Sequence, residues 1–440
     1  MLGTYNDIRM IDRQYTAKIT FILIFLFLGA IAVLIPLNSF DTTPKPITAS
    51  PFEVIASDLD SPRGIAFGLD GALYIAEAGR GSGELCLPGP NYEIMEFESY
   101  CFGLSGAVTR VIDGHQERIV IGLPSFASAD GSEGVGPNDV AIHGDDVFIL
   151  VGLGANPALR DNSALPAPAS NLGTIIRLMD GGEWETIVDI AAYEASENPD
   201  GGNIDSNPFG LVAFEDGFVV ADAGANDVLG VDASNNVFTL AVVPDGTADA
   251  PAFLELAPNA KVPMQSVPTS IVIGPDGNYY VGQLTGFPFP VGAANIFKMT
   301  PEEEPLVFAD GFTNIVDLDF DDDGYLWVLE IAGNSLLADE PAGSLIRVSP
   351  DGTRETVMSE GLIMPAGLAI GPDSSIYVSN CGTCVGVGEV IRVSVIEPDA
   401  SRANDDLVTL LVSVGLVISV AIASTGGVFL IIRKNRESAI

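Results

Sequence analysis

PRGIAFGLDGALYIAEAG, residues 62–79, contains two short apolar runs on either side of an Asp-Gly turn. Two strands of about five residues around such a turn form a β-hairpin, because Gly and Asp tolerate the backbone angles of a tight turn. The same pattern begins again at Pro137, Pro208, Pro268, Ile315 and Pro365. A pattern that recurs at this spacing is typical of solenoids, propellers and arrays.

A third apolar run follows each hairpin, and a fourth follows in five of the six copies. The sixth copy lacks its fourth run, but FEVIASDLDSPRG, from Phe52, has the pattern of RETVMSEGLIMPAG, from Arg354. Four strands per repeat form a propeller blade, and a strand taken from the other end of the domain closes the ring. We therefore predict an all-β, six-bladed β-propeller over 52–395, in which the N-terminal strand 52–59 pairs with 388–395 of the last blade.

Two uncharged apolar stretches, 19–37 and 407–432, are each long enough as a helix to cross a membrane. Basic residues flank them on the outer sides, in the tails 1–18 and 433–440, and basic flanks stay cytoplasmic. We expect terminal transmembrane helices, linkers at 38–51 and 396–406, and a propeller on the extracytoplasmic side of the plasma membrane. The first stretch could instead be a cleaved signal peptide, although no A-x-A-like cleavage site follows it.

The region between the two stretches is strongly acidic. The whole chain has 19 Lys and Arg against 59 Asp and Glu, and the tails hold six basic and three acidic residues. The region between them therefore has 13 basic and 56 acidic residues, a net charge of −43. Nucleic acid is excluded as a partner, because phosphate binding needs clustered Lys and Arg. The acidity serves either solubility outside the cell or the attraction of divalent cations.

All four cysteines lie in this outer region. Cys86 and Cys101 share one Gly- and Pro-rich insertion, so an oxidising compartment predicts a disulfide between them. Cys381 and Cys384 form a C-x-x-C, which could be a short-range disulfide, a redox pair or half of a metal site. Insertions near 80–105, 155–172 and 244–266 make the repeats longer than usual, and such loops often carry binding function.

Several stretches resemble the ScyD/ScyE family of β-propeller proteins. They are YIAEAGRGSGELC from Tyr74, the run from Glu197 to Asp232, YVGQLTGFPFPVGAAN from Tyr280, the run from Gly311 to Ala332, and IYVSNCGT from Ile376. The single hairpins also resemble NHL repeats. The resemblance implies a six-bladed extracytoplasmic propeller and no established reaction, so it supplies no catalytic residues. The C-x-x-C departs from the family pattern, and the C-terminal apolar stretch lies outside the resemblance.

Aligning the six hairpins gives two columns of residues at one edge of the inner strands. The second strands end at Glu77, Gly152, Asp222, Gln283, Glu330 and Asn380, and the first strands begin at Gly64, Asp139, Gly210, Ser270, Asp317 and Gly367. Together with Asn138, these columns predict a ring of polar side chains around one mouth of the central channel. Its five carboxylates, from Glu77, Asp139, Asp222, Asp317 and Glu330, could bind Ca²⁺ through oxygen atoms. Alternatively, they bond to backbone groups of neighbouring blades, or they form a catalytic site.

Other kinds of site have weaker support in the sequence. Asp319, Asp321, Asp323, Gly324 and Glu330 match the EF-hand pattern, but they lie on the fifth hairpin, where Glu330 is roughly 20 Å from the turn at ~3.3 Å per residue. Only His115 and His143 exist, which excludes His-rich zinc sites. A basic column on the third strands is expected to pair with acidic neighbours: Arg110, Arg177, Lys298, Arg347 and Arg392.

The sequence as a whole favours a membrane-tethered propeller that acts as a binding or scaffold module. Its ligand would be a small molecule, a polysaccharide or a protein outside the cell. The alternative is a metal-dependent lactonase-like hydrolase or sugar dehydrogenase with its site at the channel mouth. Converging carboxylates at that mouth would favour the enzyme, and an occluded channel would favour the scaffold.

Overall fold

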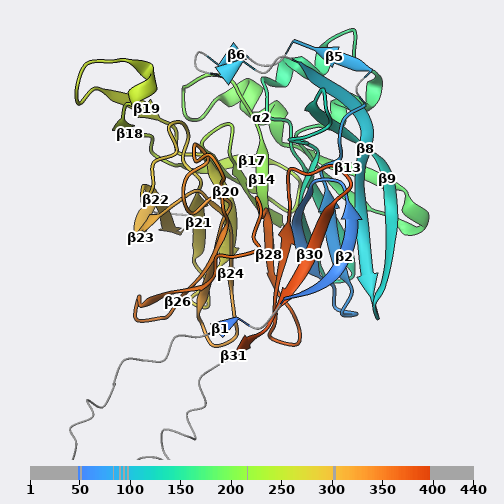
Figure 1. Ribbon diagram of the computed structural model, residues 1–440. Helices are drawn as coiled ribbons and strands as arrows, with labels where there is room; N and C mark the ends of the chain where they lie inside the picture. Colours follow the sequence, from blue (N-terminus) through green and yellow to red (C-terminus); the bar gives the residue numbers. More distant parts are fainter. Residues whose placement is uncertain are drawn as a thin grey trace, which may run out of the picture. The chain divides into compact units, whose positions relative to one another are not determined.

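The chain folds into six antiparallel sheets, which are the blades of a β-propeller (Figure 1); five have four strands, and the first has a fifth, short strand, β5 (Leu85–Leu87). This computed structural model describes residues 48–49, 52–82, 84–88, 91–92, 95–96, 99–215, 217–300 and 304–396. The first strands of neighbouring blades contact one another all the way round the ring, so they are the innermost strands and surround the central axis. The prediction of a six-bladed all-β propeller is confirmed.

The first three blades follow one another along the chain, and in blade 1 the short strands β5, β6 (Asn91–Tyr92) and β7 (Met95–Glu96) come between the second and third blade strands. Blade 1 consists of β3 (Pro62–Phe67), β4 (Leu73–Glu77), β8 (Tyr100–Ile112) and β9 (His115–Ser128). Blade 2 consists of β10 (Pro137–His143), β11 (Asp146–Val151), β12 (Thr174–Leu178) and β13 (Trp184–Asp189). Blade 3 consists of β14 (Pro208–Phe214), β15 (Gly217–Asp222), β16 (Asp227–Val231) and β17 (Val237–Val242).

The last three blades complete the ring. Blade 4 consists of β20 (Pro268–Ile273), β21 (Tyr279–Gln283), β22 (Ala294–Met299) and β23 (Leu306–Phe312). Blade 5 consists of β24 (Ile315–Phe320), β25 (Leu326–Glu330), β26 (Ser344–Val348) and β27 (Arg354–Met358). Blade 6 consists of β28 (Gly367–Ile370), β29 (Ile376–Asn380), β30 (Gly388–Val393) and the N-terminal strand β2 (Glu53–Leu59).

The ring closes as predicted, because β2 pairs antiparallel with β30, with Glu53 opposite Arg392 and Leu59 opposite Gly388. A short strand, β1 (Thr48–Ala49), continues this closure by pairing with β31 (Val395–Ile396). Residues 48–49, which the sequence assigned to a linker, are therefore part of the propeller. The chain enters and leaves the propeller at neighbouring positions (Figure 1).

The propeller has two different faces. At the turn face, short tight turns join the strands of each hairpin, and β1 and β31 lie on this side (Figure 1). At the loop face, where the second strands end, the chain makes all its longer excursions. These are β5–β7 (Leu85–Leu87, Asn91–Tyr92 and Met95–Glu96), η1 and η2 (Pro157–Asp161 and Ala167–Asn171), α2 (Ile190–Glu197), and the β18–β19 hairpin (Gly246–Asp249 and Lys261–Met264) with η4 (Ala252–Leu254).

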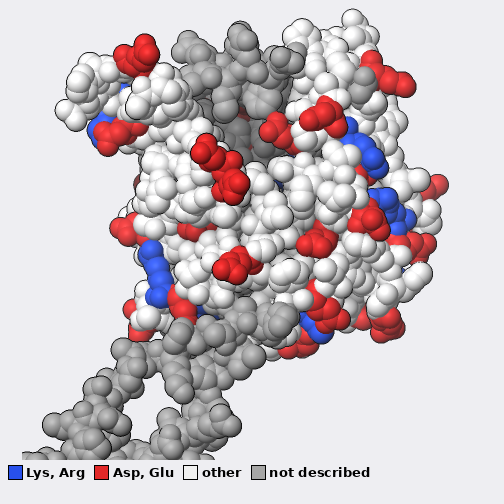
Figure 2. All heavy atoms as spheres, in the orientation of Figure 1, with Lys and Arg blue, Asp and Glu red and all other residues white. Residues whose placement is uncertain are grey.

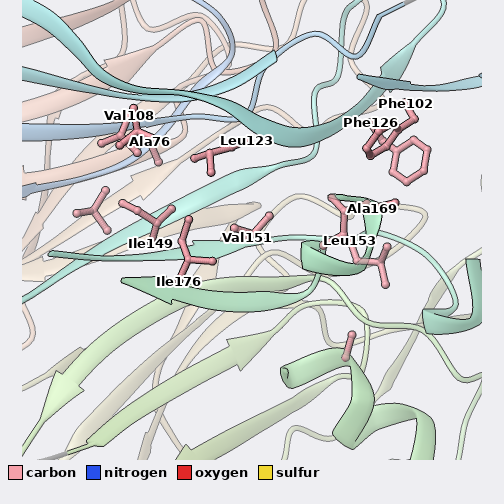
Figure 3. Packing of buried hydrophobic residues seen from close by; sticks show 14 of the residues in the cluster. Ala76, Phe102, Val108, Leu123, Phe126, Ile149, Val151, Leu153, Ala169 and Ile176 are labelled. Atoms are coloured by element: carbon pink, nitrogen blue, oxygen red, sulfur yellow. The ribbon is translucent and has the colours of Figure 1, made fainter. Parts of the chain in front are cut away.

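The apolar core lies between the blades. In the cluster of Figure 3, Ala76 and Val108 of blade 1 pack with Ile149 and Ile176 of blade 2. All four side chains are fully buried, and full burial of such an aliphatic side chain contributes about 1.5–3 kcal/mol. Each blade thus covers the face of the next, so the propeller depends on an unbroken ring.

Several features of the structure extend or test the sequence predictions. The predicted Cys86–Cys101 disulfide is present, and it joins β5 to a β8 that is longer than expected. Cys381 and Cys384 form a second disulfide. α2 was not predicted; it begins after Asp189, whose side chain accepts a hydrogen bond from the Ala192 N–H at 2.9 Å.

Within the part of the chain that the structure describes, no helix is both long and apolar enough to cross a membrane. The predicted spans 19–37 and 407–432 lie outside the described residues.

Ring closure can be tested with two substitutions on β2. Leu59 is fully buried, whereas Val54 on the same strand is 47% exposed. We expect Leu59→Ala to lower the free energy of unfolding by about 2–5 kcal/mol, because it leaves a cavity between β2 and the propeller. Val54→Ala should cost about 0.5 kcal/mol or less. Denaturant unfolding of the full chain in detergent measures both, and equal effects would contradict a closure that depends on β2.

Candidate functional site

The residues that end the second strands of the hairpins, which we call the second-strand column, hold the loop that leads into each blade. In four blades its side chain accepts a hydrogen bond from a backbone N–H of the loop that leads into the first strand, and Gln283 instead bonds the Ser266 hydroxyl of that loop. The acceptors are Glu77 from Asp60, Asp222 from Asn207, Glu330 from Thr313 and Asn380 from Ile363. The bonds to Glu77 and Glu330 are buried and those to Asp222 and Asn380 are partly buried, and a buried N–H without an acceptor would be costly, so the column stabilises the fold.

Glu77 shows how completely such a side chain can be occupied. Its carboxylate is fully buried and accepts from the Asp60 N–H at 2.8 Å and from the Thr109 hydroxyl at 2.6 Å. The Arg118 guanidinium donates from Nε at 2.9 Å and from Nη2 at 2.6 Å, a bidentate pair. Four donors and one positive charge leave Glu77 little capacity to bind a cation.

The other members of this column are similarly engaged. Asp222 accepts from the backbone N–H groups of Asn207, Gly224 and Ala225 and from the Ser206 hydroxyl. The Oε1 of Gln283 accepts from the N–H and the amide of Asn295. Gly152 leaves room for Asn138, whose amide nitrogen donates to the Pro208 carbonyl of the next blade at 2.9 Å.

The residues that begin the first strands, which we call the first-strand column, line the inner ring and join neighbouring blades. Asp139 of blade 2 accepts from the Leu211 N–H of blade 3 at 2.7 Å and from the Val140 N–H at 2.8 Å. Asp317 of blade 5 makes the same pair of bonds, to Leu368 of blade 6 and to Leu318. The remaining positions are small because the neighbour approaches closely: a Cβ on Gly64 would lie 2.0 Å from Asp139 Oδ1.

Asp139 and Asp317 are the two predicted carboxylates that interact across the ring. Burial raises the pKa of Asp139 to about 7. Burial also raises the pKa of Asp317 well above its usual value, and repulsion from Asp139 raises it further. Both carboxylates are partly buried and their described hydrogen-bond donors are backbone N–H groups, so each favours its protonated form more than an exposed Asp does.

Side chains that the ring prediction did not include make contacts between blades at the loop-face end of the inner strands. Arg63, 7% exposed, donates to the Gly134 carbonyl at 2.8 Å, and its guanidinium lies 5.8 Å from the ring centre of Phe209 in blade 3. Phe209 and Leu284 pack against the apolar cluster of blades 5 and 6. These contacts cross the ring. Arg63 and Phe209 each follow the proline that begins their repeat, as PRG and PFG show in the sequence.

The structure separates the five predicted carboxylates into different environments. Among the described residues, no group of three or more Asp, Glu, His or Cys side chains is gathered closely enough to hold a metal ion. The EF-hand-like run is also divided: Asp321 accepts from Tyr325 and Trp327 at the turn, whereas Glu330 binds the loop at the other end of its strand.

The basic column has the structural role that the sequence predicted. Each member pairs with an acidic side chain on an adjacent strand or turn: Arg110 with Asp70, Arg177 with Glu185, Lys298 with Asp276, Arg347 with Glu355, and Arg392 with Glu53 and Asp373. These pairs are partly exposed, so each contributes little to stability alone.

One hollow of about 430 Å³ lies on the outer rim, between β23 of blade 4 and β27 of blade 5. Its lining includes Val307, Phe308, Pro350 and Arg354, and it is remote from the inner ring. Arg354 is already engaged there, stacked 4.0 Å from the ring centre of Phe312.

No protein-family model matches the sequence, and no curated protein matches it. Solved structures with a similar fold include virginiamycin B lyase from Staphylococcus aureus, at 12% identity and a TM-score of 0.41, over 79% of this chain and 99% of that one. A calcium-binding protein, regucalcin, from Agrobacterium tumefaciens has 12% identity and a TM-score of 0.42, over 79% and 96%. A nidogen/laminin complex has 14% identity and a TM-score of 0.38, over 64% and 84%. Similarity at this level says nothing about function.

The buried acids predict how stability depends on pH. Because the pKa of Asp139 is raised above its unfolded value, folding favours its protonated form. The contribution of the protonated Asp139 to the free energy of unfolding is therefore complete below about pH 4 and is lost as the pH rises through about 7. Asp139→Asn should flatten the fall in unfolding free energy between about pH 4 and 7, by up to about 1.4 kcal/mol per pH unit.

The control is Asp145→Asn, an exposed acid in the turn of the same hairpin, which should leave the slope unchanged. Urea unfolding of the full chain between pH 5 and 8, with chelator present, measures both slopes. If the unfolding free energy of Asp139→Asn falls with pH as steeply as that of the parent, Asp139 is not the group that causes the fall.

Proposed function

We propose that this chain is a membrane-tethered, extracytoplasmic binding module that recognises a protein partner with its loop face. The observation that carries the proposal is the asymmetry of the propeller. Every longer excursion lies on the loop face, and both ends of the propeller lie on the turn face. Binding functions commonly reside in loops that a rigid scaffold positions.

The chemistry of the loop face favours an apolar contact. The β18–β19 hairpin exposes Phe253 at 63% and Leu256 at 53%, and nearby Val291 is 68% exposed. Phe253 packs edge-on against Phe287 at 6.1 Å, which in turn packs against Phe289 at 6.4 Å. Aliphatic and phenyl groups without polar partners suit a protein surface better than a sugar, whose hydroxyls require hydrogen bonds.

The surface charge restricts the partner further. Figure 2 shows acidic side chains spread over the visible face, with fewer Lys and Arg between them. Long-range repulsion of this kind disfavours acidic proteins and acidic polysaccharides. The partner surface is therefore neutral or basic, with an apolar centre.

The enzyme alternative, a lactonase-like hydrolase or sugar dehydrogenase at the channel mouth, has less support. Its candidate residues already have partners within the propeller: Glu77 binds Arg118, and Asp222 accepts four hydrogen bonds. Arg63 of blade 1 and Phe209 of blade 3 also contact each other at the loop-face end of the inner strands. A substrate would have to displace these contacts before it reached a carboxylate.

The proposed tether agrees with the position of the chain ends. Ten residues, 397–406, separate β31 from the predicted span that begins at Leu407. At ~3.5 Å per residue they can extend by about 35 Å at most. A membrane anchor at 407–432 would therefore lie on the side of the turn face and would leave the loop face free.

Thiol labelling of intact cells tests the membrane side. All four cysteines of the chain are in disulfides, so the parent protein provides a background without free thiols. Leu256→Cys should react with a membrane-impermeant maleimide in intact cells, and Ser438→Cys should react only after permeabilisation. The opposite pattern would place the propeller in the cytoplasm.

Site-specific photo-crosslinking tests the binding face. A photoreactive amino acid at position 256 of the full chain, in membranes of the native host, should give one discrete crosslinked protein. Phe253→Ser should remove that product, because it removes apolar contact area. The matched control is position 69 on the turn face, where Leu69 is 81% exposed. Equal crosslinking at 69 and 256, or none at 256, would contradict recognition by the loop face.

A further inference from the structure

A group of buried oxygen atoms lies at the loop-face end of blade 3, between the blade and α2. Asp227 begins β16 and is directly opposite Asp222, the last residue of β15. Glu194 comes from α2, and Asp200 comes from the loop that follows α2. Residues directly opposite on antiparallel strands have their Cβ atoms about 5 Å apart, so the two aspartates are close neighbours.

Four of these oxygen atoms have no hydrogen-bond donor. They are Oδ1 and Oδ2 of Asp227, Oε2 of Glu194 and Oδ1 of Asn198. The side chains of Asp227 and Glu194 are 0% and 1% exposed, so water does not reach them from the surface. Asn198 ends α2 one turn after Glu194, and its N–H donates to the Glu194 carbonyl at 3.0 Å. A buried carboxylate without donors is a costly arrangement.

The charges here are all of one sign. Burial, followed by repulsion from Asp222, raises the pKa of Glu194 to about 7. Burial raises the pKa of Asp227 well above its usual value, and Asp222, Glu194 and Asp200 raise it further. No ion pair between described residues reaches this group. Glu77 in blade 1 occupies the same position as Asp222, and there Arg118 supplies the positive charge that blade 3 lacks.

We propose that this group is a calcium site, in which Asp227, Glu194 and Asn198 provide oxygen ligands to one Ca²⁺ ion. Ca²⁺ takes six to eight oxygen ligands from carboxylates, amide and backbone carbonyls and water, in flexible geometry. The two carboxylates and the amide supply four free oxygen atoms of the kinds that Ca²⁺ prefers, and backbone carbonyls or water bound with the ion would complete its coordination. Asp222, whose oxygens are held by four donors, contributes negative charge from close by without being a ligand.

The ligand types separate Ca²⁺ from other ions. Zinc sites are built from Cys and His, and neither occurs in this group. Mg²⁺ requires near-ideal octahedral geometry and gives up its water reluctantly, so an enclosed site suits it poorly. A set of two carboxylates and an amide is also compatible with the finding that no three acidic, His or Cys side chains converge on one point in the described residues.

Calcium binding to the full chain, purified in detergent and stripped with chelator, tests the proposal. Isothermal titration with CaCl₂ should detect one ion per chain at this site, and Ca²⁺ should raise the thermal unfolding midpoint in proportion to the logarithm of its concentration. Asp227→Asn and Glu194→Gln should each weaken binding by at least about tenfold, the loss seen even for outer partners of metal sites. In chelator, Asp227→Asn should unfold at a higher temperature than the parent, because the substitution removes repulsion.

Two controls separate this site from other acidic positions. Glu197→Gln changes an exposed acid on the same helix, and Asp317→Asn changes a partly buried acid of the inner ring. Both should retain the parent affinity for Ca²⁺. The proposal is overturned if Ca²⁺ has no effect on the parent and only acid stabilises it, or if Asp227→Asn binds Ca²⁺ as the parent does. Loss of binding in Asp317→Asn alone would move the site to the channel and overturn it equally.

Discussion

The pairing of β2 with β30 is the contact on which the rest of the molecule depends. A blade buries its apolar faces only against its neighbours, so a ring with a gap would expose two faces at once. Taking the outermost strand of blade 6 from the other end of the domain closes that gap with backbone hydrogen bonds. It also places the beginning and the end of the propeller together on the turn face. The loop face is left free to carry insertions, which is where the chain has added them.

Acidic residues in this propeller serve as acceptors for the backbone more often than as reactive groups. A loop that enters a blade brings an N–H into the interior, and a carboxylate or amide at the end of the second strand accepts from it. On the inner ring, Asp139 and Asp317 connect adjacent first strands in the same way. A carboxylate with two N–H donors gains much of what it loses by leaving water, but burial still raises its pKa. Structural use of this kind explains why a polar column recurs without forming a single site.

Repetition made the architecture predictable from the sequence. Six hairpins with the same turn chemistry define the blades, and the similarity between residues 52–64 and 354–367 identifies the closing strand. The direction of individual side chains was not predictable. The columns of Glu77 and Asp139 lie at the same edge of the blade, but one points to the incoming loop and the other joins neighbouring blades. Partners such as Arg118 for Glu77 depend on how far a long side chain reaches across strands. Asp222 and Asp227 of blade 3 stand in the run from Glu197 to Asp232, but the sequence did not show that they are buried or that Glu194, which precedes this run, lies close to them.

Blade 3 connects the buried acidic group to the loop face through one short segment. The loop after α2 ends in Ser206 and Asn207, which both bond to Asp222. Ser206 also exchanges backbone hydrogen bonds with Ala155 of the blade 2 insertion, at 3.2 and 3.4 Å. A proton or a cation that neutralises Glu194 and Asp227 therefore stabilises the loop after α2. Because Ser206 bonds to Ala155, the same neutralisation also stabilises the blade 2 insertion. In a medium rich in divalent cations, a bound ion would stabilise two loops of the binding face without touching a ligand. A scaffold with long loops gains from this kind of support, because loops open locally more readily than the core strands that carry them.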